Sequence, residues 1–79
     1  MTNIEKYNKT FIDFFKIEEK YLFDLKYQSI TAWDSIGHMG LIAELEMAFD
    51  IMMDTDDVIE LSSYNKGKEI LTKSFNIEF

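Results

Sequence analysis

Residues 34–49 decide the fold of this chain, and they read DSIGHMGLIAELEMAF. Apolar residues return every three or four positions in this stretch, which is the spacing of one face of an α-helix. We expect a helix from Ser35 to about Phe49, because Asp34 or Ser35 can accept hydrogen bonds from the free N–H groups of its first turn. The face that this spacing predicts to be buried consists of Ile36, Met39, Ile42, Leu45 and Phe49, widened by Leu41.

The segment before this helix predicts a first helix and a long connection. Thr2 and Glu5 stand at the spacing of a capping box, so a helix is expected over residues 3–16. The connection over residues 17–34 is long for a compact domain unless it is held to the core. A short helical turn is expected within it, over residues 18–23. The apolar residues that can hold the connection to the core are Tyr21, Leu22, Phe23, Leu25 and Ile30.

The segment after residue 49 predicts two further helices. Asp54 and Asp57 are spaced as a cap at the start of a short helix over residues 55–61. A last helix then begins at Ser62 or Ser63. Its inner face is expected to contain Tyr64, Gly67, Ile70 or Leu71, and Phe75, with Gly67 at a close approach between helices.

The composition favours an all-α class. The chain has 79 residues, no proline and three glycines, which favours helices over a turn-rich β fold. We expect one domain, residues 1–79, folded as a small four-helix bundle with three main helices, one short helix and a long first loop. The absence of cysteine excludes a disulfide framework and a thiolate metal site. The acids of residues 54–60 do not match the EF-hand pattern, so no metal site is expected there.

The net charge of −7 lies in one block of the chain. Residues 27–65 carry eight acids and no lysine, whereas the rest carries seven acids and eight lysines. Such a field disfavours nucleic acids and anionic membranes and favours partners with basic patches. A face that promotes solubility is the alternative interpretation. Because the N-terminus lacks the apolar region of a secretory signal and no apolar run approaches a membrane span, a cytoplasmic protein is expected.

The tripeptide Asp34-Ser35-Ile36 is followed by four segments of distinct composition. They are an acidic amphipathic helix, an acidic-aromatic turn, a short helix and a serine-rich start of the last helix. These segments read LIAELE (41–46), AFDI (48–51), TDDVIE (55–60) and LSSY (61–64). In this order, residues 33–71 resemble the acyl carrier protein family, whose attachment motif is Asp-Ser-Leu at the start of its second helix. The tripeptide alone is common by chance, whereas the tripeptide with all four segments in register is specific.

The resemblance implies that Ser35 carries a 4′-phosphopantetheine arm, which a phosphopantetheinyl transferase takes from coenzyme A. The thiol of the arm would hold an acyl group as a thioester, and the chain, expected to be a monomer, would catalyse nothing itself. The residues expected beside the arm are Asp34, Ile36 and His38. The residues expected to dock the transferase, and the acyl- or aminoacyl-activating enzymes and transferases, are Glu44, Glu46, Met47, Asp50, Asp56, Asp57 and Glu60. The residues expected to line an acyl pocket between the second and third helices are Leu41, Leu45, Met53, Val58 and Leu61.

Departures from the family pattern bear on the pathway. Gly37 and Gly40 stand where the family often has acids, and Met47 replaces another acid. The surface near the serine is therefore less acidic than in carriers of fatty acid biosynthesis, and we expect a dedicated carrier of a specialised pathway. The alternatives are an aminoacyl or peptidyl carrier, and a protein-interaction bundle that is not loaded.

Several other side chains near the motif have two interpretations. His38 follows the serine by three residues and is either a contact for the arm or a partner, or a plain solvent histidine. A hydrolase is a remote alternative because the G-x-S-x-G elbow is absent. Trp33 is expected to pack in the core. Met53 is expected to face inward, and Met47 or Met52 to lie on the face that binds a partner.

Overall fold

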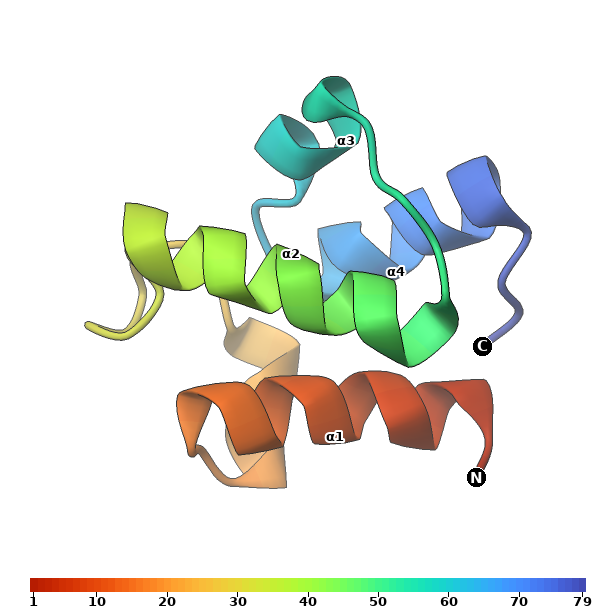
Figure 1. Ribbon diagram of the computed structural model, residues 1–79. Helices are drawn as coiled ribbons and strands as arrows, with labels where there is room; N and C mark the ends of the chain where they lie inside the picture. The colour runs from red at the N-terminus through yellow and green to blue at the C-terminus, as the bar shows by residue number, and fades with distance from the viewer.

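The computed structural model describes residues 1–79 as a helical bundle without strands. Its elements are α1 (Asn3–Phe15), a 3₁₀ helix η1 (Glu19–Asp24), α2 (Ser35–Phe49), α3 (Thr55–Glu60) and α4 (Tyr64–Phe75). Helices α1 and α2 lie side by side and run in opposite directions, with α4 behind α2 and the short α3 above it in the view of Figure 1. The bundle is therefore all-α, as the sequence predicts.

Side-chain caps set where the helices begin. Each α-helix starts after a residue whose side chain accepts a hydrogen bond from the backbone N–H three positions later, which satisfies a group that the helix itself leaves free. The capping residues are Thr2, Asp34, Asp54 and Ser63. The predicted capping box of Thr2 and Glu5 is present, with Glu5 N to Thr2 Oγ1 at 3.2 Å and Thr2 N to Glu5 Oε1 at 2.9 Å.

Aromatic rings fill the centre of the core. Trp33 is completely buried, and its ring stacks on Phe15 with centroids 5.3 Å apart. Phe11 packs edge-on against the same indole at 5.8 Å, and Tyr7 lies beside Phe11 at 4.9 Å. The prediction that Trp33 packs in the core is confirmed, and this large ring joins the start of α2 to α1.

The buried face of α2 differs from the predicted one. Leu41, Ile42 and Leu45 are buried, but Ile36 is 83% exposed and Met39 is 58% exposed. The prediction was wrong at Ile36 and Met39 because α2 is apolar almost all the way round, so that the spacing of apolar residues does not single out one face. His38, one turn before Leu41 and Ile42, takes the half-buried position at the start of the helix instead.

The long connection is held to the core by fewer side chains than predicted. Leu22 and Leu25 are buried and Ile30 is half-buried, whereas Tyr21 is 55% and Phe23 is 64% exposed. The prediction was therefore wrong for Tyr21, whereas Phe23, although largely exposed, meets the buried ring of Tyr64 edge-on with centroids 5.7 Å apart. The predicted helical turn is present as η1, and in a 3₁₀ helix residues three apart share a side, so Leu22 and Leu25 point to the core together.

Backbone hydrogen bonds hold the rest of the connection. Tyr27 N donates to Ser62 O at 2.9 Å, and Tyr64 N donates to Leu25 O at 3.0 Å. These bonds attach the connection to the segment between α3 and α4. Tyr27 is thereby brought next to the segment that follows α3, although the two are distant in the sequence.

Two glycines allow helices to approach α1 closely. A Cβ at Gly67 would lie 2.2 Å from Tyr7 Oη, so the predicted close approach at Gly67 is confirmed and joins α4 to α1. A Cβ at Gly40 would lie 2.4 Å from Phe14 Cζ, so α2 needs a glycine where it crosses α1. Any other residue at either position would push the helices apart.

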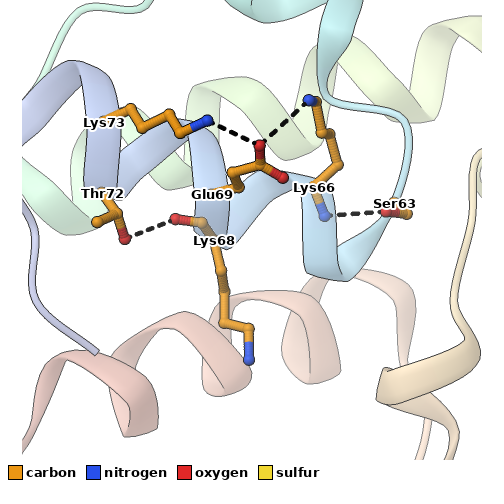
Figure 2. A network of polar contacts seen from close by, with 6 residues as sticks. All are labelled: Ser63, Lys66, Lys68, Glu69, Thr72 and Lys73. Atoms are coloured by element: carbon orange, nitrogen blue, oxygen red, sulfur yellow. Dashed lines mark hydrogen bonds and ion pairs between the residues drawn. The ribbon is translucent and has the colours of Figure 1, made fainter.

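Three of the eight lysines lie on α4. Figure 2 shows Glu69 between Lys73, at 3.1 Å, and Lys66, at 3.6 Å. The hydrogen bond from Lys73, followed by the charges of Lys66 and Lys73, lowers the pKa of the Glu69 carboxyl. These exposed ion pairs add little stability, and with Lys68 the last helix carries three lysines and one acid.

Candidate functional site

Ser35 lies at the first residue of α2 and is exposed. The helix is capped by the residue before it, since Asp34 Oδ1 accepts a hydrogen bond from Gly37 N at 2.7 Å. The sequence left open whether Asp34 or Ser35 caps the helix, and the structure assigns the cap to Asp34. The Ser35 hydroxyl is thus placed at a helix N-terminus without serving as its cap, where backbone N–H groups and the helix dipole favour an anion.

A groove of about 380 Å³ opens beside Ser35. Its walls come from three parts of the chain: the long connection, the start of α2, and α3 with the segment after it. The lining residues are Tyr27, Ser35, His38, Met39, Val58, Ile59, Leu61 and Ser62. The groove is mostly apolar, and its volume lies at the small end of the range for ligand sites.

His38 forms two hydrogen bonds that join the three sides of this site. Trp33 Nε1 lies 2.9 Å from His38 Nδ1, and an indole N–H can only donate, so Nδ1 is the acceptor and carries no proton. The proton is therefore on Nε2, which donates to Val58 O at 2.7 Å. The ring is also nearly parallel to that of Trp33, with centroids 6.2 Å apart, and it meets Tyr27 edge-on at 5.5 Å.

The interpretation of His38 as a plain solvent histidine was wrong. Its side chain is half-buried, and both ring nitrogens are bonded within the protein. No nitrogen remains to take a proton from Ser35, which removes the geometric basis of a Ser–His dyad. His38 connects α2 to α3 across twenty residues of sequence.

The predicted acyl-pocket residues fall into two groups. Val58 and Leu61 line the groove beside Ser35. Leu41 and Leu45 are completely buried in the core, and Met53 is half-buried against it, so these three do not line the groove. The space open to a ligand lies at the surface beside α2, because aromatic and leucine side chains fill the interior.

Sequence reasoning missed four lining residues of the groove. They are Tyr27, Met39, Ile59 and Ser62. Met39 was assigned to the core by its spacing. Tyr27 and Ser62 come together through the backbone hydrogen bond between them, and no local pattern in the sequence marks such a contact.

The predicted partner-binding acids do not share one face. Glu46 Oε2 accepts a hydrogen bond from Met53 N at 2.9 Å and so holds the loop between α2 and α3. Glu44 lies on another side of α2, because residues two apart are about 200° apart around a helix. There Glu44 lines a hollow of about 500 Å³ between α1 and α2, together with Lys6 and Lys9.

The remaining predicted partner residues lie at the end of α2 and on α3. Asp50 is exposed at the C-terminal end of α2, and Asp56 and Glu60 are exposed on α3. Asp57 is half-buried, and its backbone N–H is bonded to Asp54. Two exposed acids of the block thus lie on α3, which lines the groove, whereas Asp50 lies at the end of α2 opposite to Ser35.

Exposed apolar side chains accompany these acids. On α2, Ile36, Met39 and Met47 are 83%, 58% and 72% exposed. Met52 and Ile59 are similarly exposed beside and on α3. Met53 packs against the core as predicted, and Met47 and Met52 are both exposed, while their place on a partner-binding face stays a prediction. Large exposed apolar side chains near one site are typical of a surface that contacts another molecule.

Comparisons with other proteins do not identify this site. No group of three or more histidine or acidic side chains is arranged to hold a metal ion. None of the helices has both the length and the apolar character needed to cross a membrane. The chain matches no protein-family model, no curated protein and no solved structure.

Proposed function

We propose that this chain is a four-helix carrier domain of the acyl carrier protein type, with a 4′-phosphopantetheine arm on Ser35. The observation that carries the proposal is the placement of Ser35: exposed at the start of a long helix, relieved of the capping role by Asp34, and at the edge of an apolar groove. A serine that only capped the helix would use its own oxygen for that bond.

The chemistry of the site suits such an arm. The phosphodiester would lie against the free N–H groups of the first turn of α2, which favour negative charge. The arm would supply a thiol to a chain that has no cysteine, and this thiol would hold an acyl group as a thioester. The apolar groove offers the first part of the arm, or a small cargo, a surface shielded from water.

The test is enzymatic loading followed by intact-mass analysis. The purified protein is incubated with coenzyme A and a broad-specificity phosphopantetheinyl transferase. We expect one phosphopantetheine addition in the wild type and none in Ser35→Ala. Ser62→Ala is the matched control, since it removes a serine from the same groove and should load normally.

Two results would contradict the proposal. One is the absence of any addition to the folded wild-type protein, and the other is an addition that persists in Ser35→Ala. Circular dichroism of both variants shows that each is folded, and since Asp34 provides the cap, Ser35→Ala should unfold at nearly the wild-type temperature.

A protein-interaction bundle that is not loaded is the second candidate. The exposure of Ile36, Met39 and Met47 favours it, because these apolar side chains on α2 could bind a partner without any arm. The loading experiment separates the two functions directly. Among loaded carriers, an acyl cargo and an aminoacyl or peptidyl cargo are distinguished by which activating enzyme acylates the arm.

A further inference from the structure

We infer that His38 is a positioning residue, which holds α3 against the start of α2 and thereby fixes the α3 wall of the groove beside Ser35. The contact between His38 and α3 would thereby control access to that groove. Its meaning for cargo rests on the proposed function, whereas the contact between His38 and α3 exists in the protein without an arm.

Helix α3 has few other contacts, chiefly the packing of the half-buried Val58 against the core. It has six residues and none of them is buried. An isolated helix of this length is not stable in water, so its position depends on contacts with the rest of the protein. The loop before it is held by the bond from Met53 N to Glu46, and Leu61 anchors the chain after it in the core.

The bond from His38 satisfies a backbone carbonyl that α3 cannot satisfy itself. Val58 O lies in the last turn, and the N–H four residues later belongs to Ser62, beyond the end of the helix at Glu60. The Nε2–H group of His38 occupies this position at 2.7 Å. We call the two hydrogen bonds of His38, to Trp33 and to Val58 O, the tie. Its direction is fixed, because Trp33 donates to Nδ1 and so leaves the ring proton on Nε2.

The same tie determines the shape of the groove. Val58 and Ile59 form its α3 wall, while His38 and Met39 form its α2 wall. Because the hydrogen bond joins the two walls directly, its loss would let α3 move away from α2 and widen the groove. The Trp33 end of the tie is completely buried, so the fixed point of the arrangement is the core and not the surface.

The test compares His38→Phe with His38→Gln in the protein without an arm. Phenylalanine keeps a flat ring beside Trp33 but cannot form either hydrogen bond. The glutamine amide can accept from Trp33 with its oxygen and donate to Val58 O with its NH₂ group. Met39→Gln is the matched control, since it changes a neighbouring groove residue that is not part of the tie.

Amide hydrogen exchange followed by NMR provides the readout. The relevant amides are those of Val58 and Leu61, bonded within α3 to Asp54 O and Asp57 O. In His38→Phe we expect these amides to exchange about five- to tenfold faster while α1 and α4 keep their protection. His38→Gln and Met39→Gln should remain close to the wild type. Unchanged exchange at α3 in His38→Phe would overturn the inference, and so would equal acceleration in His38→Gln.

Two further measurements keep the inference testable if His38→Phe loses its fold. Imidazole ¹⁵N spectra of the wild type should show the neutral ring with its proton on Nε2. A proton on Nδ1 would overturn the inference. In His38→Gln, amide exchange at α3 should remain slow, and this measurement does not depend on whether His38→Phe folds. Since neither measurement involves coenzyme A, their failure is distinct from a failure of Ser35 to load.

Discussion

At the scale of single residues, Tyr7 shows how one polar group fixes helices in the core. Its ring is completely buried, and its hydroxyl donates to Tyr64 O at 2.7 Å across the close approach at Gly67. Burial, and to a smaller extent the nearby Tyr64, raises the pKa of the Tyr7 phenol far above its usual value. The hydroxyl therefore remains a neutral donor wherever the protein is folded.

We expect Tyr7→Phe to lower the free energy of unfolding by about 1–2 kcal/mol at neutral pH, because a buried hydrogen bond is lost. The pKa in the fold lies above the unfolded value of 10.0, so the contribution of Tyr7 is complete below pH 10 and declines as pH rises beyond it. Urea unfolding at pH 7 and above pH 10 should thus show a shallower alkaline decline for Tyr7→Phe. Tyr21→Phe, at a half-exposed ring, is the control, and equal alkaline slopes in wild type and Tyr7→Phe would contradict the expectation.

Residues with local signals were predictable from the sequence, whereas residues with distant partners were not. Trp33 was placed in the core because it is a large aromatic residue, and Ser35 was singled out by its position before an apolar helix. The role of His38 was missed, because it depends on a carbonyl twenty residues away. Histidine is intermediate in burial, so its residue type alone does not indicate an inward position.

At the scale of elements, α2 presents apolar side chains to both the core and the solvent. Its buried side carries Leu41, Ile42 and Leu45, and its exposed side carries Met39 and Met47. Helix starts were predicted well because each cap lies within three residues of the group that it bonds. The buried face of α2 was predicted poorly, because only packing against α1 and the rest of the core decides which apolar side is covered.

This division predicts very different losses of stability for two substitutions that are two residues apart on α2. Leu45→Ala should lower the free energy of unfolding by about 2–5 kcal/mol, since it leaves a cavity in the core. Met47→Ala, at a side chain that is 72% exposed, should change it by no more than about 0.5 kcal/mol. Chemical denaturation of both variants measures the difference. A large loss of stability in Met47→Ala would mean that this exposed side is covered, for example by a second molecule.

At the scale of the whole molecule, charge is divided between two surfaces. On α4, Lys66 and Lys73 flank Glu69, while the exposed acids Asp56 and Glu60 lie on α3. The sequence showed that the acids are grouped in residues 27–65, but it did not show where these acids lie on the surface. Glu46 is bonded within the α2–α3 loop and Glu44 faces the lysines of α1, so neither belongs to the surface beside Ser35.

If a basic transferase approaches Ser35 across α3, the acids on that helix should control how fast it binds. We expect the double change Asp56→Lys and Glu60→Lys to slow phosphopantetheine transfer several-fold, mainly by raising KM, because charge complementarity acts chiefly on the rate of encounter. The matched control is Glu18→Lys with Asp24→Lys, which changes the net charge equally at exposed acids outside the block.

Transfer rates at rising salt complete this experiment. Transfer to the wild type should slow as salt shortens the range of the protein's electrostatic field, which is about 8 Å at physiological ionic strength. Transfer to the α3 variant should depend less on salt. Equal slowing by both double variants would show that net charge alone matters. A rate that is insensitive to salt and to the α3 charges would instead point to the exposed Ile36 and Met39, next to Ser35, as the surface that the transferase recognises.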